Sequence, residues 1–245
     1  MNQITQAAVL CGGLGTRLRP LTFEKPKPLL EVGGKPMLEL VLSKLVKNGI
    51  TEAILLTGYK SDMIEDYFGD GRGYGLRIKY SIEDKPLGSA GALLQTVDSL
   101  AVNFLVCNCD TILDYPVCDL AKKHIESKAL ATLLLAKVDE IERFGIAELD
   151  GDGAVTRFLE KPKPDETKSK LASMQVFVLN KGTFEYSKKD SFSMEREVFP
   201  QMCHARKVFG LEKPARIPWV DVGTLSDLET VNAAVEQGEH AWLFK

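Results

Sequence analysis

The sequence predicts an α/β fold with a mostly parallel sheet that helices cover on both faces. Short apolar runs alternate with segments of helical period through the first half of the chain. The first apolar run, residues 7–10, breaks at once into a glycine-rich loop. Beyond residue 128 apolar runs follow one another, and the Asp-Gly turn at residues 150–153 indicates an antiparallel hairpin. We expect one domain over residues 1–245.

The predicted elements follow from periodicity and from residues typical of helix and strand ends. The predicted strands are residues 7–10, 51–57, 76–82, 101–107, 129–138, 144–149, 155–159, 171–179, 206–211 and 216–220. The predicted helices are residues 36–48, 61–68, 88–97, 193–204 and 224–237. The first helix begins at Pro36 and ends before Gly49, and Thr224 is expected to cap the last.

Composition excludes several classes of protein. The formal net charge of −3 gives no overall basic field for nucleic acid, and no apolar run approaches the roughly 20 residues that span a bilayer. The first residues lack the pattern of a secretory signal. Five cysteines without CxxC spacing and three dispersed histidines argue against structural zinc and a disulfide framework. We therefore expect a cytoplasmic protein without nucleic-acid or membrane partners, whose assembly into a homo-oligomer stays open.

The loop after the first strand has the composition of a polyphosphate site. Glycines let the backbone adopt positive φ and approach a ligand closely, and cations follow within the same segment. These residues are Gly12, Gly13, Gly15, Arg17, Arg19, Lys25 and Lys27. The segment is neither a P-loop nor GxGxxG, which argues against a generic NAD-binding domain. The alternative is an ordinary glycine turn with solvated basic residues.

Two aspartates stand at the ends of predicted strands. Asp110 closes the strand at 101–107, and Asp221 follows the strand at 216–220. In open α/β sheets ligands bind outside the carboxyl ends of the strands, and Mg²⁺ takes carboxylate and phosphate oxygens. Each aspartate alone is more typical of a turn or a helix cap. Together with the glycine loop they predict a magnesium site.

Seven segments in order, between about residues 7 and 230, carry a resemblance to a known family. They are GGLGTRLRPLT, KPKPLL, PLGSAGAL, NCD, FGIAEL, FLEKP and WVDVGT. The chain resembles the sugar-1-phosphate nucleotidyltransferases, within them the mannose-1-phosphate guanylyltransferase branch. The resemblance implies a Rossmann-like mixed sheet, a nucleotide-binding half at 1–128, and a half at 129–245 with an antiparallel sugar-binding hairpin and the last helix. The carboxy-terminal β-helix of many members is expected to be missing.

The resemblance also implies roles for individual residues. Arg17 and Lys27 would neutralise the triphosphate as catalytic cations, and Asp110 and Asp221 would ligate Mg²⁺. The implied nucleotide-binding residues are Leu10, Gly12, Gly13, Gly15, Thr16, Glu83 and Gly88. The implied sugar-phosphate residues are Gly145, Glu160, Lys161 and Gln175. Gln175 stands where relatives have a small residue, in the segment that corresponds to their Asn-Ala-Gly.

The implied reaction is transfer of a nucleotidyl group to a sugar 1-phosphate, with release of pyrophosphate. GTP is favoured because a carboxylate at Glu83 accepts the adjacent N1–H and N2–H₂ of guanine, whereas uracil and thymine offer one N–H between two carbonyls. Mannose 1-phosphate or a related sugar is the expected acceptor. The alternatives are thymidylyl or uridylyl transfer to glucose 1-phosphate, and a non-catalytic relative that regulates an active partner.

Overall fold

The chain forms two compact units, and each unit is made of three separate segments of the sequence. The computed structural model describes residues 4–186 and 192–245. The glycine-loop unit comprises Val9–Pro86, Asn108–Tyr115 and Arg216–Lys245. The hairpin unit comprises Met1–Ala8, Leu87–Cys107 and Pro116–Ala215. The division near residue 128 stays a prediction.

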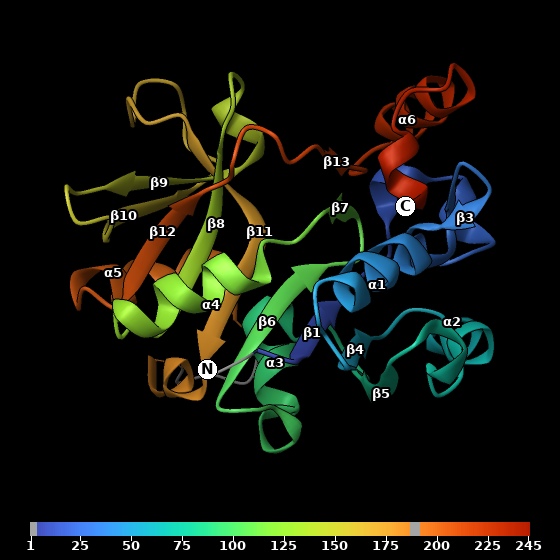
Figure 1. Cartoon of the computed structure of the whole chain (residues 1–245), viewed down its shortest axis with the longest axis horizontal. Helices are drawn as coiled ribbons and strands as arrows, with labels where there is room; N and C mark the ends of the chain where they lie inside the picture. Colours follow the sequence, from blue (N-terminus) through green and yellow to red (C-terminus); the bar gives the residue numbers. More distant parts are fainter. Residues whose placement is uncertain (1–3, 187–191) are drawn as a thin grey trace. The chain divides into compact units, whose positions relative to one another are not determined.

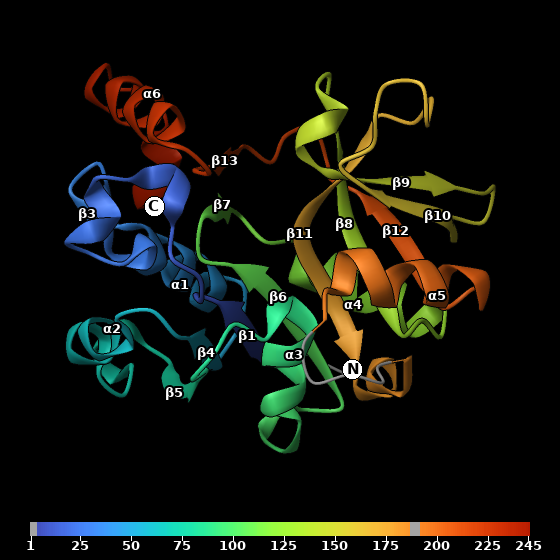
Figure 2. The same ribbon diagram turned by 180° about the vertical axis from the view of Figure 1, so that it is seen from behind.

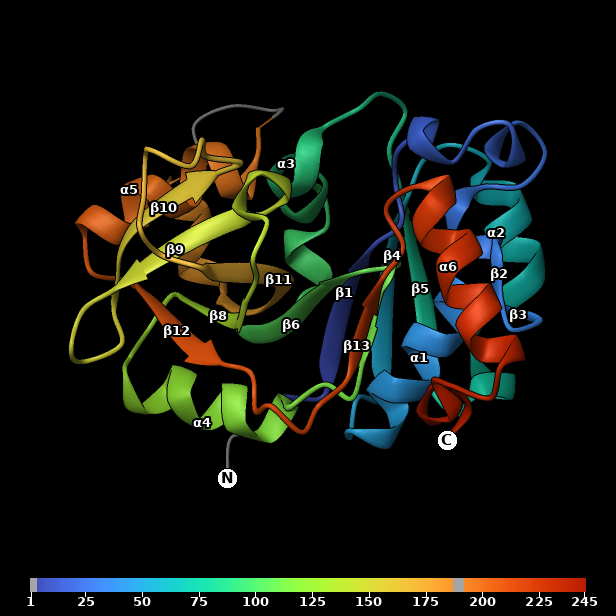
Figure 3. The ribbon, with the colours of Figure 1, turned by 90° about the horizontal axis from the view of Figure 1, so that it is seen from above.

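The glycine-loop unit is built on a parallel strand pair. Strand β4 (Glu52–Thr57) pairs in parallel with β5 (Arg77–Ile82), and β1 (Gln6–Leu10), whose last two residues belong to this unit, precedes β4 in the strand order. Its helices are α1 (Met37–Lys47), α2 (Ser61–Phe68) and α6 (Leu225–Glu236). Two short antiparallel ladders complete it, β2 (Glu31–Val32) with β3 (Lys35–Pro36) and β7 (Thr111–Leu113) with β13 (Trp219–Asp221). Figure 3 shows α6 beside β2 and β3.

The hairpin unit contains the antiparallel strands. Its strands are β6 (Asn103–Asn108), β8 (Ala131–Lys137), β9 (Gly145–Leu149), β10 (Val155–Glu160), β11 (Leu171–Asn180) and β12 (Val208–Glu212). The order is β10-β9-β11-β6, and β8 pairs antiparallel with β11 and parallel with β12. Its helices are α3 (Gly88–Gln95), α4 (Val117–Glu126), a π-helical turn at Met194–Val198, and α5 (Phe199–His204). Helices α4 and α5 cover opposite faces of these strands, as Figures 1 and 2 show.

Burial follows the patterns in the sequence. All six residues of β4 are buried, as expected for a parallel strand covered on both faces. In α6 the Thr224 hydroxyl accepts from the Asp227 N–H and the Asp227 carboxylate accepts from the Thr224 N–H, which is a capping box. The predicted α/β class, with a mixed sheet and helices on both faces, is confirmed. Within the described ranges, no helix has the length and apolar character needed to cross a bilayer.

His124 of α4 is a buried polar residue of the hairpin unit. Its Nδ1 lies 3.0 Å from Thr132 Oγ1 and its Nε2 lies 3.3 Å from Asn103 Oδ1. Burial lowers the pKa of His124 to about 4, so the ring is neutral in the folded protein at neutral pH. The unfolded chain takes up a proton there near pH 6.5.

We predict that acidification from about pH 6.5 to pH 4 destabilises the protein by up to about 3 kcal/mol through His124. Between these two pH values the unfolded state binds a proton at His124 and the folded state does not. Above about pH 6.5 neither state binds it, so the contribution of His124 to the free energy of unfolding no longer changes with pH. Urea unfolding at several pH values would measure it. His124→Gln should show a shallower pH dependence, whereas His204→Gln, at an exposed position, should match the parent. Parallel curves for the parent and His124→Gln would contradict the assignment.

Candidate active site

The glycine loop needs its glycines for backbone conformation and for space. Gly13 and Gly15 have φ of 97° and 58°, a region that favours glycine. A Cβ on Gly15 would lie 2.8 Å from Thr22 Cγ2. Before the loop, Leu10 O accepts from the Cys109 N–H at 3.2 Å. After it, Thr16 and Arg17 lie in a single 3₁₀ turn, Thr16–Leu18. The loop therefore has an exposed backbone at Gly12 and Gly13, directly after β1.

Asp110 and Asp221 come together through the ladder of β7 and β13. Asp221 pairs with Thr111 in register, and the Thr111 hydroxyl donates to Asp221 Oδ1 at 3.3 Å. Asp110 directly precedes β7, and its carbonyl accepts from the Val222 N–H at 3.1 Å. Burial, followed by the negative charge of Asp110, raises the pKa of Asp221 to about 6. The two predicted carboxylates thus lie together at half-buried positions in the glycine-loop unit.

Two cations accompany these carboxylates. The Lys27 ammonium donates to Asp110 Oδ2, in an ion pair whose side chains are only 14% and 13% exposed. Arg17 is exposed, and its Nη1 lies 3.4 Å from the point that a Cβ on Gly223 would occupy. Asp221 Oδ2 lies 3.7 Å from that same point. The structure therefore brings the two predicted cations and the two predicted metal ligands together.

The donor set fits a hard divalent cation. Asp110 Oδ1 is buried and has no hydrogen-bond partner in the described part of the chain. Burying such an oxygen unpaired is costly, as is placing two carboxylates side by side. A Mg²⁺ ion would relieve both costs, and it commonly takes one or two protein carboxylates beside substrate phosphates. Asp110 and Asp221 are thus suited to hold it.

Glu83 lies against the glycine loop from the end of β5. A Cβ on Gly12 would lie 2.9 Å from Glu83 Oε1, and one on Gly58 would lie 2.9 Å from Glu83 Cγ. The Glu83 N–H donates to Thr57 O at 2.9 Å. A side chain at residue 12 or 58 would clash with Glu83, so glycine at both positions leaves room for this carboxylate beside the loop. Its contact with a nucleobase stays a prediction.

Gly88 belongs to the hairpin unit, where it begins α3. Its φ is 74°, and a Cβ there would lie 2.5 Å from Phe192 O. The Phe192 carbonyl accepts from the Ala90 N–H at 3.1 Å. The turn therefore requires glycine for structural reasons, and the contact of Gly88 with the base stays a prediction.

Gly145 and Glu160 are cross-strand partners at the end of the β9–β10 hairpin. A Cβ on Gly145 would lie 2.9 Å from Glu160 Oε2. Burial, followed by the charge of Glu195, raises the pKa of Glu160, while Lys161 and Arg196 act in the opposite direction. The sequence did not predict a role for Glu195, because only the fold brings it near Glu160.

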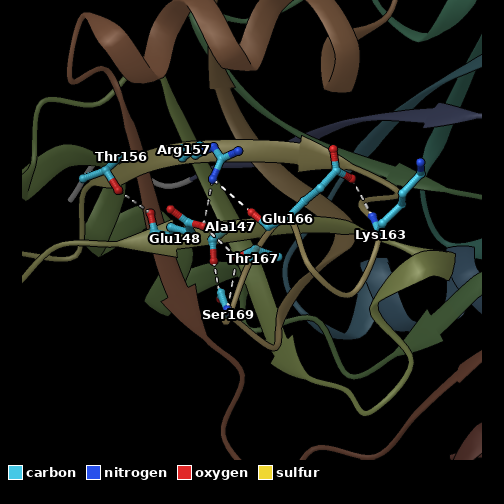
Figure 4. Close-up of polar contacts among 8 residues, drawn as sticks. All are labelled: Ala147, Glu148, Thr156, Arg157, Lys163, Glu166, Thr167 and Ser169. Atoms are coloured by element: carbon cyan, nitrogen blue, oxygen red, sulfur yellow. Dashed lines mark hydrogen bonds and ion pairs between the residues drawn. The ribbon is translucent and has the colours of Figure 1, made fainter.

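Lys161 directly follows this strand in a left-handed conformation. Its φ is 55°, and its N–H donates to Phe144 O at 3.0 Å. The loop beyond it folds back on the hairpin, with Thr167 Oγ1 donating to Glu148 Oε1 at 2.6 Å and Arg157 Nη1 donating to Glu166 O at 3.2 Å (Figure 4). These bonds hold the chain on both sides of Lys161.

Gln175 adopts a conformation that disfavours its own side chain. Its φ is 54°, and it lies where the register between β11 and β8 shifts, between Ser173 and Phe177. The Gln175 N–H donates to Ser173 Oγ at 3.3 Å. A non-glycine residue in this region costs about 1–2 kcal/mol. Glutamine therefore stands at a half-buried position whose backbone favours glycine.

Comparison with known proteins assigns the chain to a family. The family model described as "Nucleotidyl transferase" matches residues 6–238. Mannose-1-phosphate guanyltransferase of Schizosaccharomyces pombe is 35% identical over 92% of this chain and 62% of its own length. Mannose-1-phosphate guanyltransferase beta-B of Xenopus laevis is 36% identical over 92% of this chain and 63% of its own.

The fold agrees with that match. The crystal structure of HddC from Yersinia pseudotuberculosis superposes with a TM-score of 0.80 at 24% identity, covering 95% of this chain and all of that one. The chain spans about three fifths of the length of the two guanyltransferases. The predicted resemblance is confirmed: this chain belongs to the nucleotidyl transferase family.

Proposed function

We propose that the chain transfers a guanylyl group from GTP to mannose 1-phosphate, releasing pyrophosphate and forming GDP-mannose. The observation that carries the proposal is the half-buried Asp110–Asp221 pair with Lys27, beside an exposed glycine loop. Family membership and the two relatives named as mannose-1-phosphate guanyltransferases support the choice of substrates.

In the proposed reaction a sugar-phosphate oxygen attacks the α-phosphorus of the triphosphate. The bond from the α-phosphorus to the oxygen bridging to the β-phosphorus breaks, and that oxygen leaves with pyrophosphate. Because the attacking phosphate is already ionised at neutral pH, no general base is needed. The Lys27 ammonium and the Arg17 guanidinium would neutralise triphosphate charge and hold it in line. Mg²⁺, when bound, would supply charge stabilisation at the phosphates.

A pyrophosphate-release screen tests the proposal. GTP, ATP, UTP and dTTP would each be paired with mannose 1-phosphate and glucose 1-phosphate in the presence of Mg²⁺. We expect GTP with mannose 1-phosphate to give the highest kcat/KM. A preference for dTTP or UTP with glucose 1-phosphate would support the alternative transfer reaction. Release from no pair would support a non-catalytic relative.

We predict that Glu83→Gln reduces the preference for GTP over UTP by about tenfold or more. The carboxylate accepts two hydrogen bonds from guanine, whereas an amide offers one acceptor and a donor group that repels guanine N–H. The kcat/KM values of both triphosphates measure the change. Asp84→Gln, one position along, serves as the control. If the parent protein preferred UTP to GTP, Glu83 would not be the residue that selects guanine.

We predict that Gln175→Gly broadens the range of sugar 1-phosphates without loss of stability. Glycine removes the strain at φ 54°, which offsets the flexibility that it adds to the unfolded chain. Gln175→Ala is the matched control, because it removes the amide and keeps the strain. Both variants should change the ratio of mannose to glucose 1-phosphate turnover, and the glycine variant should have the higher melting temperature of the two because only it loses the strain. An unchanged ratio in both would show that the amide does not contact the sugar.

A further inference from the structure

Lys44 of α1 is a buried cation of the glycine-loop unit. Its side chain is only 1% exposed. The ammonium donates to the carbonyl oxygen of Trp242 and lies 3.5 Å from Asp114 Oδ1. It also lies 5.4 Å from the centroid of the Trp242 ring. One ammonium group therefore joins α1 to the residue that follows β7 and to the segment Ala241–Phe244, which lies near the C-terminal end of the described chain (Figure 3).

This arrangement is a poor source of stability. Burial lowers the pKa of Lys44, and the negative charge of Asp114 only partly offsets that effect. Asp114 is 36% exposed and keeps Lys47 within 3.5 Å, so an apolar residue in place of Lys44 would leave no buried, unpaired carboxylate. The helix offers an apolar environment for such a residue, since Leu40 and Val41 on the same face are buried. What a lysine adds here is a fixed position for the groups that it contacts.

One of those groups, Asp114, directly follows a strand of the ladder that joins the two carboxylates. Asp114 follows Leu113, the last residue of β7, and Asp110 directly precedes the strand. Strand β7 pairs residue by residue with β13, which ends at Asp221. The buried Tyr115 hydroxyl donates to Thr111 O at 2.6 Å, so the turn after β7 is also bonded back to its start. Helix α1 packs against β7 and against the turn Lys27–Leu29.

We propose that Lys44 is a positioning residue for the Asp110–Asp221 pair: by binding Asp114 and the Trp242 carbonyl it fixes β7 against α1 and thereby sets the two carboxylates. The proposal rests on the cation site of the proposed function. In this proposal the segment Ala241–Phe244 supports the site indirectly, through its bond to Lys44, and does not touch substrate. Lys44 itself would touch neither substrate nor metal.

Lys44→Met tests this, because methionine fills the space without the charge. The matched control is Lys47→Met, since Lys47 also lies 3.5 Å from Asp114 Oδ1 but is 51% exposed. Each protein would be titrated with Mn²⁺, followed by electron paramagnetic resonance, and its melting temperature measured without metal. We expect Lys44→Met to unfold near the parent temperature and to bind Mn²⁺ roughly tenfold more weakly. Lys47→Met should match the parent in both.

Turnover and a double variant complete the test. Lys44→Met should lower kcat, and Asp114→Asn combined with Lys44→Met should weaken Mn²⁺ binding no further than either change alone. If Lys44→Met lowered the melting temperature and left Mn²⁺ affinity unchanged, Lys44 would be structural only and the proposal overturned. Equal affinities in the two methionine variants would overturn it too. Mn²⁺ binding needs no substrate, so a parent without transferase activity would refute the proposed function separately.

Discussion

Asp110→Asn and Asp221→Asn are each expected to lower kcat by about a hundredfold or more while the protein stays folded. Binding of Mg²⁺ at the phosphates contributes several kcal/mol of charge stabilisation in the transition state, and an amide oxygen is a weaker ligand than a carboxylate. Asp221→Asn should keep or raise the melting temperature, because it removes a charge whose burial, and whose proximity to Asp110, raise the pKa of Asp221 to about 6.

Steady-state kinetics at saturating Mg²⁺, with melting curves of the same preparations, would measure both effects. Asp139→Asn is the control, since its side chain is 98% exposed. Full turnover in either site variant, or normal turnover of the parent in excess EDTA, would show that these carboxylates do not hold an essential cation.

Lys27→Met is expected to lower both kcat and stability. The variant lacks the Lys27 ammonium, so the triphosphate loses a neutralising partner. We expect this loss to lower kcat by about a hundredfold. Asp110 would be left as a buried, unpaired carboxylate, at a cost of about 3 kcal/mol to folding. Kinetics and urea unfolding would measure the two losses.

A double variant separates these two effects of Lys27. Lys27→Met with Asp110→Asn should recover much of the stability, because no unpaired charge remains, but it should recover no turnover. Lys25→Met, two positions away and 53% exposed, is the control for the loop. Equal stability of Lys27→Met and the parent would mean that the ion pair does not stabilise Asp110.

The sequence predicted the helices and strands whose patterns are long and regular. The apolar run of β4, the spacing in α1 and the Thr224 cap of α6 each depend on local residues, and all three predictions are confirmed. Helix α4 was missed, although Val117, Leu120, Ala121 and His124 have the spacing of one buried helix face. Strand β7 has only three residues, which is too few for a periodic signal.

The groups around the predicted site residues depend on the fold. Lys27 and Asp110 lie 83 positions apart in the chain, so no local sequence pattern predicts their ion pair. The left-handed conformations of Lys161 and Gln175 come from a strand end and a register shift that only pairing creates. The burial of Lys44 had a signal, since it lies three and four positions after Val41 and Leu40, but its partners come from distant segments.

The fate of isotopic oxygen tests the proposed transfer most directly. Mannose 1-phosphate labelled with oxygen-18 in its non-bridging phosphate oxygens would be incubated with GTP and Mg²⁺, and the products analysed by mass spectrometry. If the sugar phosphate attacks the α-phosphorus, GDP-mannose retains all of the label and pyrophosphate contains none. Label in pyrophosphate, or release of pyrophosphate with GMP in place of GDP-mannose, would contradict the transfer.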